Sequence, residues 1–314
     1  MSSRAAYDEL QTRRGIADLS ARVKIRLTGA DRVRYLNGQV TSNVQKLATG
    51  QTQPACVTTA KGKLCAEILI TALPDALLID ADAALRETLP SRLERYIISD
   101  DVTLEDVTDT LQLIHCLPPL TESIESVLRT GFGALVYQRA HRFGREGVDF
   151  FLTADEAAAH LPALTAHHVL LDETLRETLR IEAGRPRWGR ELGEDTLPPE
   201  AGLDRTHIDY HKGCYIGQEV ISRLKSVGHV NRQLTGFIAE DETAPEVGAT
   251  IFAEGGGRAI GQITSAAWSF ALEKPIALGY LRRGSPDSGL SARPADAASP
   301  VARIAACPLP FVAP

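Results

Sequence analysis

The chain has 314 residues, of which 44% are hydrophobic and 24% charged, and its formal net charge at pH 7 is −6. A chain of this length and apolar content can bury one large core or two to three smaller ones, so we expect a globular protein. The acidic balance argues against a broad nucleic-acid surface, which needs an excess of lysine and arginine, and we expect no direct nucleic-acid binding.

The five cysteines are scattered and form neither a C-x-x-C pair nor a zinc spacing, a set typical of reduced thiols in a reducing compartment. The N-terminus lacks the apolar core of a signal peptide, and no stretch approaches the eighteen apolar residues of a membrane helix. We therefore expect a cytoplasmic protein without a membrane contact.

Residues 1–117 predict an α+β lobe. The expected elements are a helix over 7–14, a strand over 21–27, a helix starting at 31 and interrupted at Asn37-Gly38, a hairpin of strands 54–59 and 64–69, a strand over 76–80, a helix over 82–97 broken by Pro90, and strands over 102–107 and 111–116.

Residues 118–232 predict a second α+β lobe. Its expected elements are a helix from Glu122, strands over 134–138 and 148–152, an alanine-rich helix from Thr153 and a helix over 174–183 that ends at Gly184. The pair His167-His168 is a poor metal site, because adjacent side chains point to different sides and no further ligand stands at a suitable step. We expect no metal.

Residues 233–314 predict a small antiparallel β-barrel. Short strands are expected over 234–239, 250–252, 260–265 and 276–280, with an irregular tail after Arg283 and a final strand near 301–304. The three glycines at 255–257 predict a hairpin tip, since no phosphate-binding glycine motif surrounds them.

The most unusual stretch runs from Asp209 to Val230. It places Cys214 between Gly213 and Gly217, two residues expected to let the chain turn sharply and approach a neighbour closely, and a helix is expected to begin at Gln218. Neighbouring positive charge and the helix start favour a thiolate, which predicts a nucleophile, a soft metal ligand or a redox-sensitive site. The alternative is a buried cysteine that acts as a small hydrophobe.

The octapeptide K-G-C-Y-I-G-Q-E at 212–219 resembles the signature of the YgfZ family of folate-binding proteins, which are relatives of the glycine cleavage T-protein (aminomethyltransferase). The resemblance implies a T-protein-like body of two related lobes and a C-terminal barrel. It also implies that the protein binds tetrahydrofolate or a derivative and acts as an accessory factor in iron-sulfur cluster assembly or repair, with an indirect effect on tRNA modification. Cluster assembly or client proteins are the expected partners.

The resemblance also implies the site residues. Cys214 would supply the thiol, and Glu182, in the segment R-I-E-A-G at 180–184, would accept hydrogen bonds from the pterin edge. The other expected folate-site residues are Arg180, Lys212, Gly213, Tyr215, Gly217, Gln218, Glu219 and Arg223, with Lys212 and Arg223 placed to attract the anionic glutamate tail. Arg205, His207 and Asp209 are alternatives for the rim.

One departure bears on the activity. The T-protein relatives carry an acidic pair after the hairpin turn, whereas this chain has Ala66 and Glu67 there. Glu67 is the remaining candidate for a catalytic carboxylate, but the missing partner argues against aminomethyl transfer. A tetrahydrofolate-dependent aminomethyltransferase is therefore the second functional hypothesis, and a non-catalytic RNA-binding module is the third.

Overall fold

The computed structural model describes residues 3–10, 12, 14–117, 137–166, 168–296 and 301–312. The chain forms two compact units: the first comprises Met1–Arg142, Glu146–Asp172 and Arg205–Ser222, and the second comprises Phe143–Arg145, Glu173–Asp204 and Arg223–Pro314. The helix predicted from Glu122 and the start of the strand predicted over 134–138 lie outside the described residues. The lobe boundaries predicted at 117 and 232 stay predictions.

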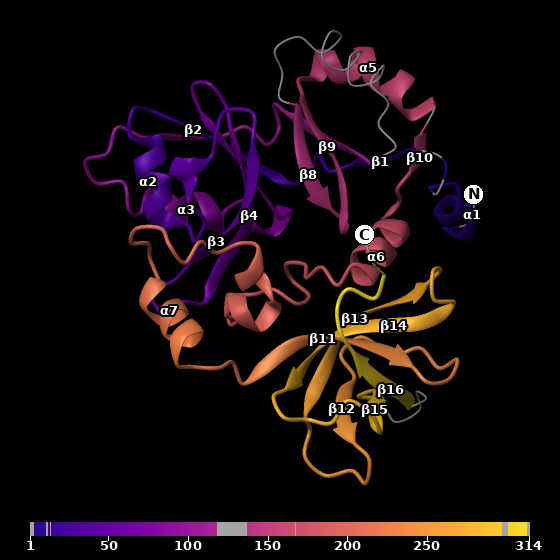
Figure 1. Ribbon diagram of the computed structural model, residues 1–314. Helices are drawn as coiled ribbons and strands as arrows, with labels where there is room; N and C mark the ends of the chain where they lie inside the picture. The colour runs from indigo at the N-terminus through magenta and orange to yellow at the C-terminus, as the bar shows by residue number, and fades with distance from the viewer. Residues whose placement is uncertain are drawn as a thin grey trace. The chain divides into compact units, whose positions relative to one another are not determined.

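The first unit contains an antiparallel five-stranded sheet in the order β3-β4-β5-β2-β6 (Figure 1). Its strands are β2 (Val23–Thr28), β3 (Thr52–Thr58), β4 (Leu64–Ala72), β5 (Leu77–Ala81) and β6 (Thr103–Asp106). The strands predicted from alternating apolar residues are therefore confirmed. Ile25, Leu27, Ile68 and Ile70 have no exposed surface, so this sheet carries a core of branched aliphatic side chains.

A second five-stranded sheet of the same unit has the order β10-β1-β7-β9-β8. Its strands are β1 (Arg14–Asp18), β7 (Gln112–Cys116), β8 (Tyr137–Arg142), β9 (Arg145–Leu152) and β10 (His168–Leu170). Strand β1 runs parallel to β10 and antiparallel to β7. The helix predicted over 7–14 is wrong at its end, because α1 spans Ser3–Glu9 and Arg14 already belongs to β1, an interior strand of this sheet.

Two further predictions about helices in this unit need correction. Asn37-Gly38 does not interrupt α2 (Arg32–Gln39), because the Asn37 side chain accepts a hydrogen bond from the Val44 amide at 3.0 Å and joins the helix end to the next turn, η1 (Val44–Lys46). The expected helix over 82–97 is replaced by the short turn η2 (Ala83–Leu85) and α3 (Thr88–Glu94). Pro90 lies in the first turn of α3, where a missing amide costs no helical hydrogen bond.

A buried network of charged side chains joins the two sheets of the first unit. Arg142 on β8 donates to Asp149 on β9 and to Asp80 on β5, and the ring of His115 on β7 lies 2.7 Å from the Asp149 carboxylate. Burial opposes the ionisation of Asp149, but Arg142 and His115 outweigh it and hold the pKa of that carboxyl well below its usual range. The first unit therefore buries Arg142 as a cation held between two carboxylates.

The remaining helices and helical turns follow β9 in the chain. They are α5 (Ala154–Ala166), α6 (Glu173–Glu182), the turns η3 (Pro198–Ala201) and η4 (Leu203–Arg205), and α7 (Gln218–Ser226). Within the described residues, no helix has the length and apolar character needed to span a membrane.

The second unit contains a closed six-stranded antiparallel barrel in the order β11-β14-β13-β12-β15-β16 (Figure 1). Its strands are β11 (Arg232–Ala239), β12 (Thr250–Ala253), β13 (Gly261–Ser269), β14 (Lys274–Arg282), β15 (Leu290–Arg293) and β16 (Ala302–Cys307). The predicted α+β body with a C-terminal barrel is confirmed. The prediction of an irregular tail is wrong, because Leu290 and Ala292 point into the barrel core and make β15 the strand that closes it with β16.

Candidate functional site

Cys214 lies on an exposed loop that ends where α7 begins, at Gln218 as predicted. Of the five cysteines it is the exposed one; Cys56 and Cys116 are buried, and Cys65 and Cys307 are half-buried. Burial raises the pKa of the Cys116 thiol to about 12. The alternative of a buried cysteine at position 214 is therefore wrong.

Lys212, two residues before this cysteine, is buried and holds the loop in place. Its Nζ donates to the backbone carbonyls of Asn37, Val40 and Ser42 at 2.6, 2.7 and 2.6 Å. Burial lowers the pKa of this ammonium to about 8. A charged ammonium has three N–H donors, and all three are used here. Any contribution of Lys212 to a ligand is therefore made through the position of residues 37–42.

The two glycines of the motif differ in what they do. Gly217 has a φ of +88°, and a Cβ atom there would lie 2.5 Å from the backbone oxygen of Thr59. The close approach predicted for Gly217 is therefore confirmed. The same prediction is wrong for Gly213, which has no positive φ and has open space where a Cβ atom would stand.

Further hydrogen bonds fix residues 207–216 to β3 and to Thr41, which follows α2. The Thr58 hydroxyl donates to the Ile216 carbonyl at 2.5 Å, the Thr41 hydroxyl donates to the His207 carbonyl at 2.6 Å, and the Asp209 amide donates to the Thr41 carbonyl at 3.0 Å. The loop that carries Cys214 is thus anchored at both ends on residues that lie some 160 positions earlier in the chain.

These anchors bring His207 to Glu67. The imidazole Nε2 lies 3.2 Å from Glu67 Oε1; the His207 side chain is 2% exposed and that of Glu67 is 26% exposed. His207 Nδ1 lies 2.7 Å from the Thr206 hydroxyl. An ionised Glu67 requires the proton on Nε2, so the Thr206 hydroxyl donates to Nδ1. Sequence reasoning had Glu67 as a candidate and His207 among three rim alternatives, and the structure brings these two together.

Glu67 also affects its neighbour across the hairpin. Cys56 stands opposite Glu67 in the register of β3 and β4. Burial, aided by the negative charge of Glu67, raises the pKa of the Cys56 thiol well above its usual value. Cys56 is therefore a buried, protonated thiol that lies beside the Glu67 carboxylate on the same face of the sheet.

The predicted pterin-reading segment belongs to the second unit. All five N–H groups of Arg180 are used: they reach Glu177, Glu191, the Arg185 carbonyl and the hydroxyl of Ser265 on β13. The carboxylate of Glu182 accepts from the Ser269 hydroxyl at 2.6 Å and the Ala271 amide at 3.3 Å. These contacts hold α6 against the barrel, and the predicted folate roles of both residues stay predictions.

The other predicted site residues surround the cysteine in sequence. Tyr215 is buried, with its ring 5.2 Å from Lys212 Nζ. Gln218 is half-buried at the start of α7, and Glu219 and Arg223 are exposed on that helix. Their predicted folate contacts stay predictions.

Models of two known domains match the N-terminal and the C-terminal parts of the chain. Residues 2–142 match the model of the GCVT N-terminal domain, and residues 232–312 match that of the glycine cleavage T-protein C-terminal barrel domain. The aminomethyltransferase of Streptomyces avermitilis is 27% identical over 305 residues, which cover 89% of this chain and 81% of that protein. A putative chloroplastic transferase of Arabidopsis thaliana is 28% identical over 292 residues, which cover 87% of this chain and 66% of that protein.

A solved structure shares the fold. The crystal structure of glycine cleavage system aminomethyltransferase T from Bartonella henselae superposes with a TM-score of 0.87 at 18% identity, covering 99% of this chain and 90% of that one. The resemblance to the YgfZ family within this group stays a prediction. The chain carries the N-terminal domain and the C-terminal barrel domain of the glycine cleavage T-protein type.

Proposed function

We propose that the protein is a tetrahydrofolate-dependent one-carbon transferase of the aminomethyltransferase type. The observation that carries the proposal is the Glu67–His207 pair, a partly exposed carboxylate in contact with a buried imidazole. The named relatives, which include aminomethyltransferases aligned over most of the chain, support the same conclusion.

The missing acidic partner at position 66 weighs less than the sequence alone indicates. Successive side chains of a strand point to opposite faces. Ala66 is fully buried on the core face of β4, whereas Glu67 shares the other face with the half-buried Cys65 and Leu69. A carboxylate at position 66 would lie in an apolar core, so Glu67 is the hairpin carboxylate available for chemistry.

The pair has the properties of a proton-handling group. Formation of methylene-tetrahydrofolate from an aminomethyl donor removes one proton from each of two accepting amines; one of these protons leaves with the departing nitrogen as ammonia, and the other goes to the donor group that releases the carbon. A carboxylate hydrogen-bonded to an imidazole can accept a proton from a bound amine and return it. With the Glu67 carboxylate accepting from Nε2, the Thr206 hydroxyl donates to Nδ1, and both ring nitrogens of His207 have a hydrogen-bond partner.

Glu67 and the loop at 212–217 are also compatible with tetrahydrofolate as the one-carbon carrier. Tetrahydrofolate, when bound, supplies secondary amines that accept a one-carbon unit. A partly exposed carboxylate such as Glu67 is a suitable acceptor for the N–H groups of such a ligand. The loop at 212–217 is held by hydrogen bonds from Lys212 to the Asn37 carbonyl and from Thr58 to the Ile216 carbonyl, so it loses less conformational freedom if it contacts a ligand.

The test is incubation of the full chain with tetrahydrofolate and an aminomethyl donor, with methylene-tetrahydrofolate and ammonia measured together. We expect Glu67→Gln to lower the rate by about 100-fold or more, since it removes the base but keeps the shape. Glu105→Gln, which changes an exposed carboxylate on the edge strand β6 of the same sheet, serves as the control and keeps the wild-type rate. Equal rates for Glu67→Gln and wild type contradict the proposal.

A second candidate function rests on the exposure of Cys214. In it the protein is a YgfZ-type folate-binding accessory factor for iron-sulfur cluster assembly or repair, with the thiol contacting a cluster or a client protein. Its test is complementation of a deletion strain, read as the activity of cluster enzymes. Cys214→Ala is expected to fail while Cys307→Ala, which changes a half-buried barrel cysteine, complements. If Cys214→Ala complements as well as wild type, this candidate is discarded.

A further inference from the structure

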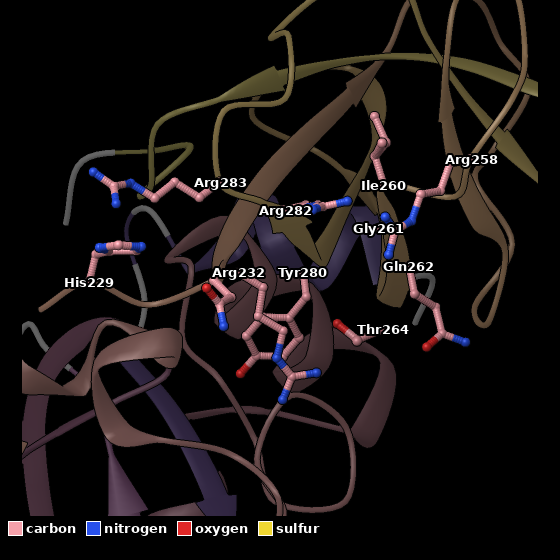
Figure 2. A pocket seen from close by; sticks show the side chains of 11 residues that line it. His229, Arg232, Arg258, Ile260, Gly261, Gln262, Thr264, Tyr280, Arg282 and Arg283 are labelled. Carbon is pink, nitrogen blue, oxygen red and sulfur yellow. The ribbon is translucent and has the colours of Figure 1, made fainter. Parts of the chain in front are cut away.

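We propose that the barrel carries a binding pocket for a small, multiply charged anion, whichever activity the Glu67–His207 pair performs. The pocket has a volume of about 650 Å³ and is formed by β11, β13, β14 and the loops beside them. Figure 2 shows its side chains, with Arg232 and Tyr280 between His229 on one side and Gln262 and Arg258 on the other. This volume falls in the range of pockets that bind small ligands.

The charge of the pocket is its most unusual property. Arg232, Arg258, Arg282 and Arg283 line it and no aspartate or glutamate does, although the chain carries a net charge of −6. Arg232 has an ion pair with Glu200 at 3.1 Å. Across the part of the chain that the structure describes, the guanidinium groups of the other three make no ion pair or hydrogen bond. The pocket therefore gathers unneutralised positive charge that attracts anions.

The strand register places two of these charges directly opposite each other. Arg232 on β11 is paired with Arg282 on β14. Like charges at directly opposite positions of an antiparallel pair destabilise a sheet. An anion bound between the two guanidinium groups offsets this repulsion, so the register of β11 and β14 favours a filled pocket.

One of the arginines is already held in position. Arg232 lies over the Tyr280 ring at 4.5 Å, and the Tyr280 hydroxyl donates to the Glu191 carbonyl at 2.8 Å. The ring therefore cannot rotate freely, and it supports the guanidinium that lies on it. A fixed guanidinium loses less conformational freedom when it binds an anion.

The residue types indicate the ligand class. Guanidinium groups bind carboxylates and phosphates through two parallel hydrogen bonds. Three unneutralised arginines and a volume much larger than a single phosphate indicate a ligand with two or more anionic groups in a row. Such a ligand is a chain of carboxylates, as in a γ-glutamyl peptide, or a chain of phosphates, as in tripolyphosphate.

The test is calorimetric titration of the full chain with tri-γ-glutamate and, separately, with tripolyphosphate, each at low and at moderate salt. We expect at least one of them to bind, more weakly as salt rises, and more tightly than glutamate or inorganic phosphate. The tighter of the two identifies the source of the anionic groups. If neither binds at millimolar concentration, the proposal is overturned.

Paired variants locate the binding. The double variant Arg282→Gln/Arg283→Gln is expected to weaken binding by about tenfold or more, and Arg258→Gln by a smaller factor. Arg293→Gln is the control, because Arg293 lies over the Phe252 ring of the same barrel and does not line the pocket. Undiminished binding by the double variant, or an equal loss in the control, overturns the proposal.

Discussion

Lys212 in the first unit and the arginines of the barrel pocket are both cationic groups beside glycine-rich segments, yet their surroundings are opposite. Lys212 is 7% exposed and all its donors reach backbone carbonyls. Arg258, Arg282 and Arg283 are exposed, and within the described residues their guanidinium groups have no partner. A cation in a sequence motif is thus not a ligand-binding group by itself. It can bind a ligand only if its hydrogen-bond donors are not already used within the protein.

The largest effect that tests this comparison is expected for Lys212→Met. The substitution leaves three buried carbonyls without a donor, and each such group costs about 1–3 kcal/mol. We expect the free energy of unfolding in denaturant to fall by about 3 kcal/mol or more. Lys46→Met, which changes an exposed lysine that lies 3.7 Å from Asp209, is the control and should cost less than about 1 kcal/mol. If both variants lose a similar free energy of unfolding, Lys212 does not anchor the loop.

The buried cation Arg142 extends the comparison to pH. Asp149→Asn removes one of its carboxylate partners while Asp80 remains, and we expect a loss of about 3 kcal/mol at pH 7. The folded-state pKa of Asp149 is depressed, so its contribution is present above the unfolded pKa of about 3.9 and is lost as pH falls below that value. The difference between the unfolding free energies of wild type and variant should therefore begin to narrow between pH 5 and pH 2, and part of it should remain at pH 2. A difference that stays constant over this range contradicts the prediction.

The two glycines around Cys214 give a smaller, paired effect. Gly217→Ala places a Cβ atom 2.5 Å from the Thr59 carbonyl at a positive φ, and we expect it to cost about 2 kcal/mol. Gly213→Ala meets open space and should change the free energy of unfolding by less than about 0.5 kcal/mol. Thermal unfolding of the two variants side by side measures the difference. Equal melting temperatures would show that the loop is not fixed at Gly217.

The smallest effect has the opposite sign. Arg282→Gln removes the like charge across from Arg232, so we expect the free protein to become more stable by about 0.2–0.5 kcal/mol. The gain should shrink at high salt, where the repulsion is screened. A loss of stability in low salt would show that Arg282 already has a stabilising role in the barrel.

Local patterns predicted much of the fold. The start of α7 at Gln218 and the barrel strands follow from apolar periodicity and turn residues, which are properties of neighbouring positions. Strand β15 escaped prediction because only Leu290 and Ala292 mark it, within a stretch rich in glycine, serine and proline. Strand β1 was missed because its neighbours come from far along the chain.

The site was harder to predict than the fold. Glu67 and His207 are 140 residues apart, and the carbonyls that hold Lys212 are 170 to 175 residues from it. No local pattern encodes such pairs. The sequence identified Glu67, Cys214 and Lys212 as candidates by residue type, but only the fold distinguishes a buried anchor from an exposed thiol.

The position of β1 has a consequence for the order of folding. This strand pairs with segments far along the chain: Ile16 pairs with Cys116 on β7, 100 residues later, and Arg14 pairs with His168 on β10, 154 residues later. The second sheet therefore cannot close until β10 has been synthesised, and until then one edge of β1 stays unpaired. A fragment that ends at residue 142 lacks both β9 and β10, so it would expose strand edges prone to aggregation.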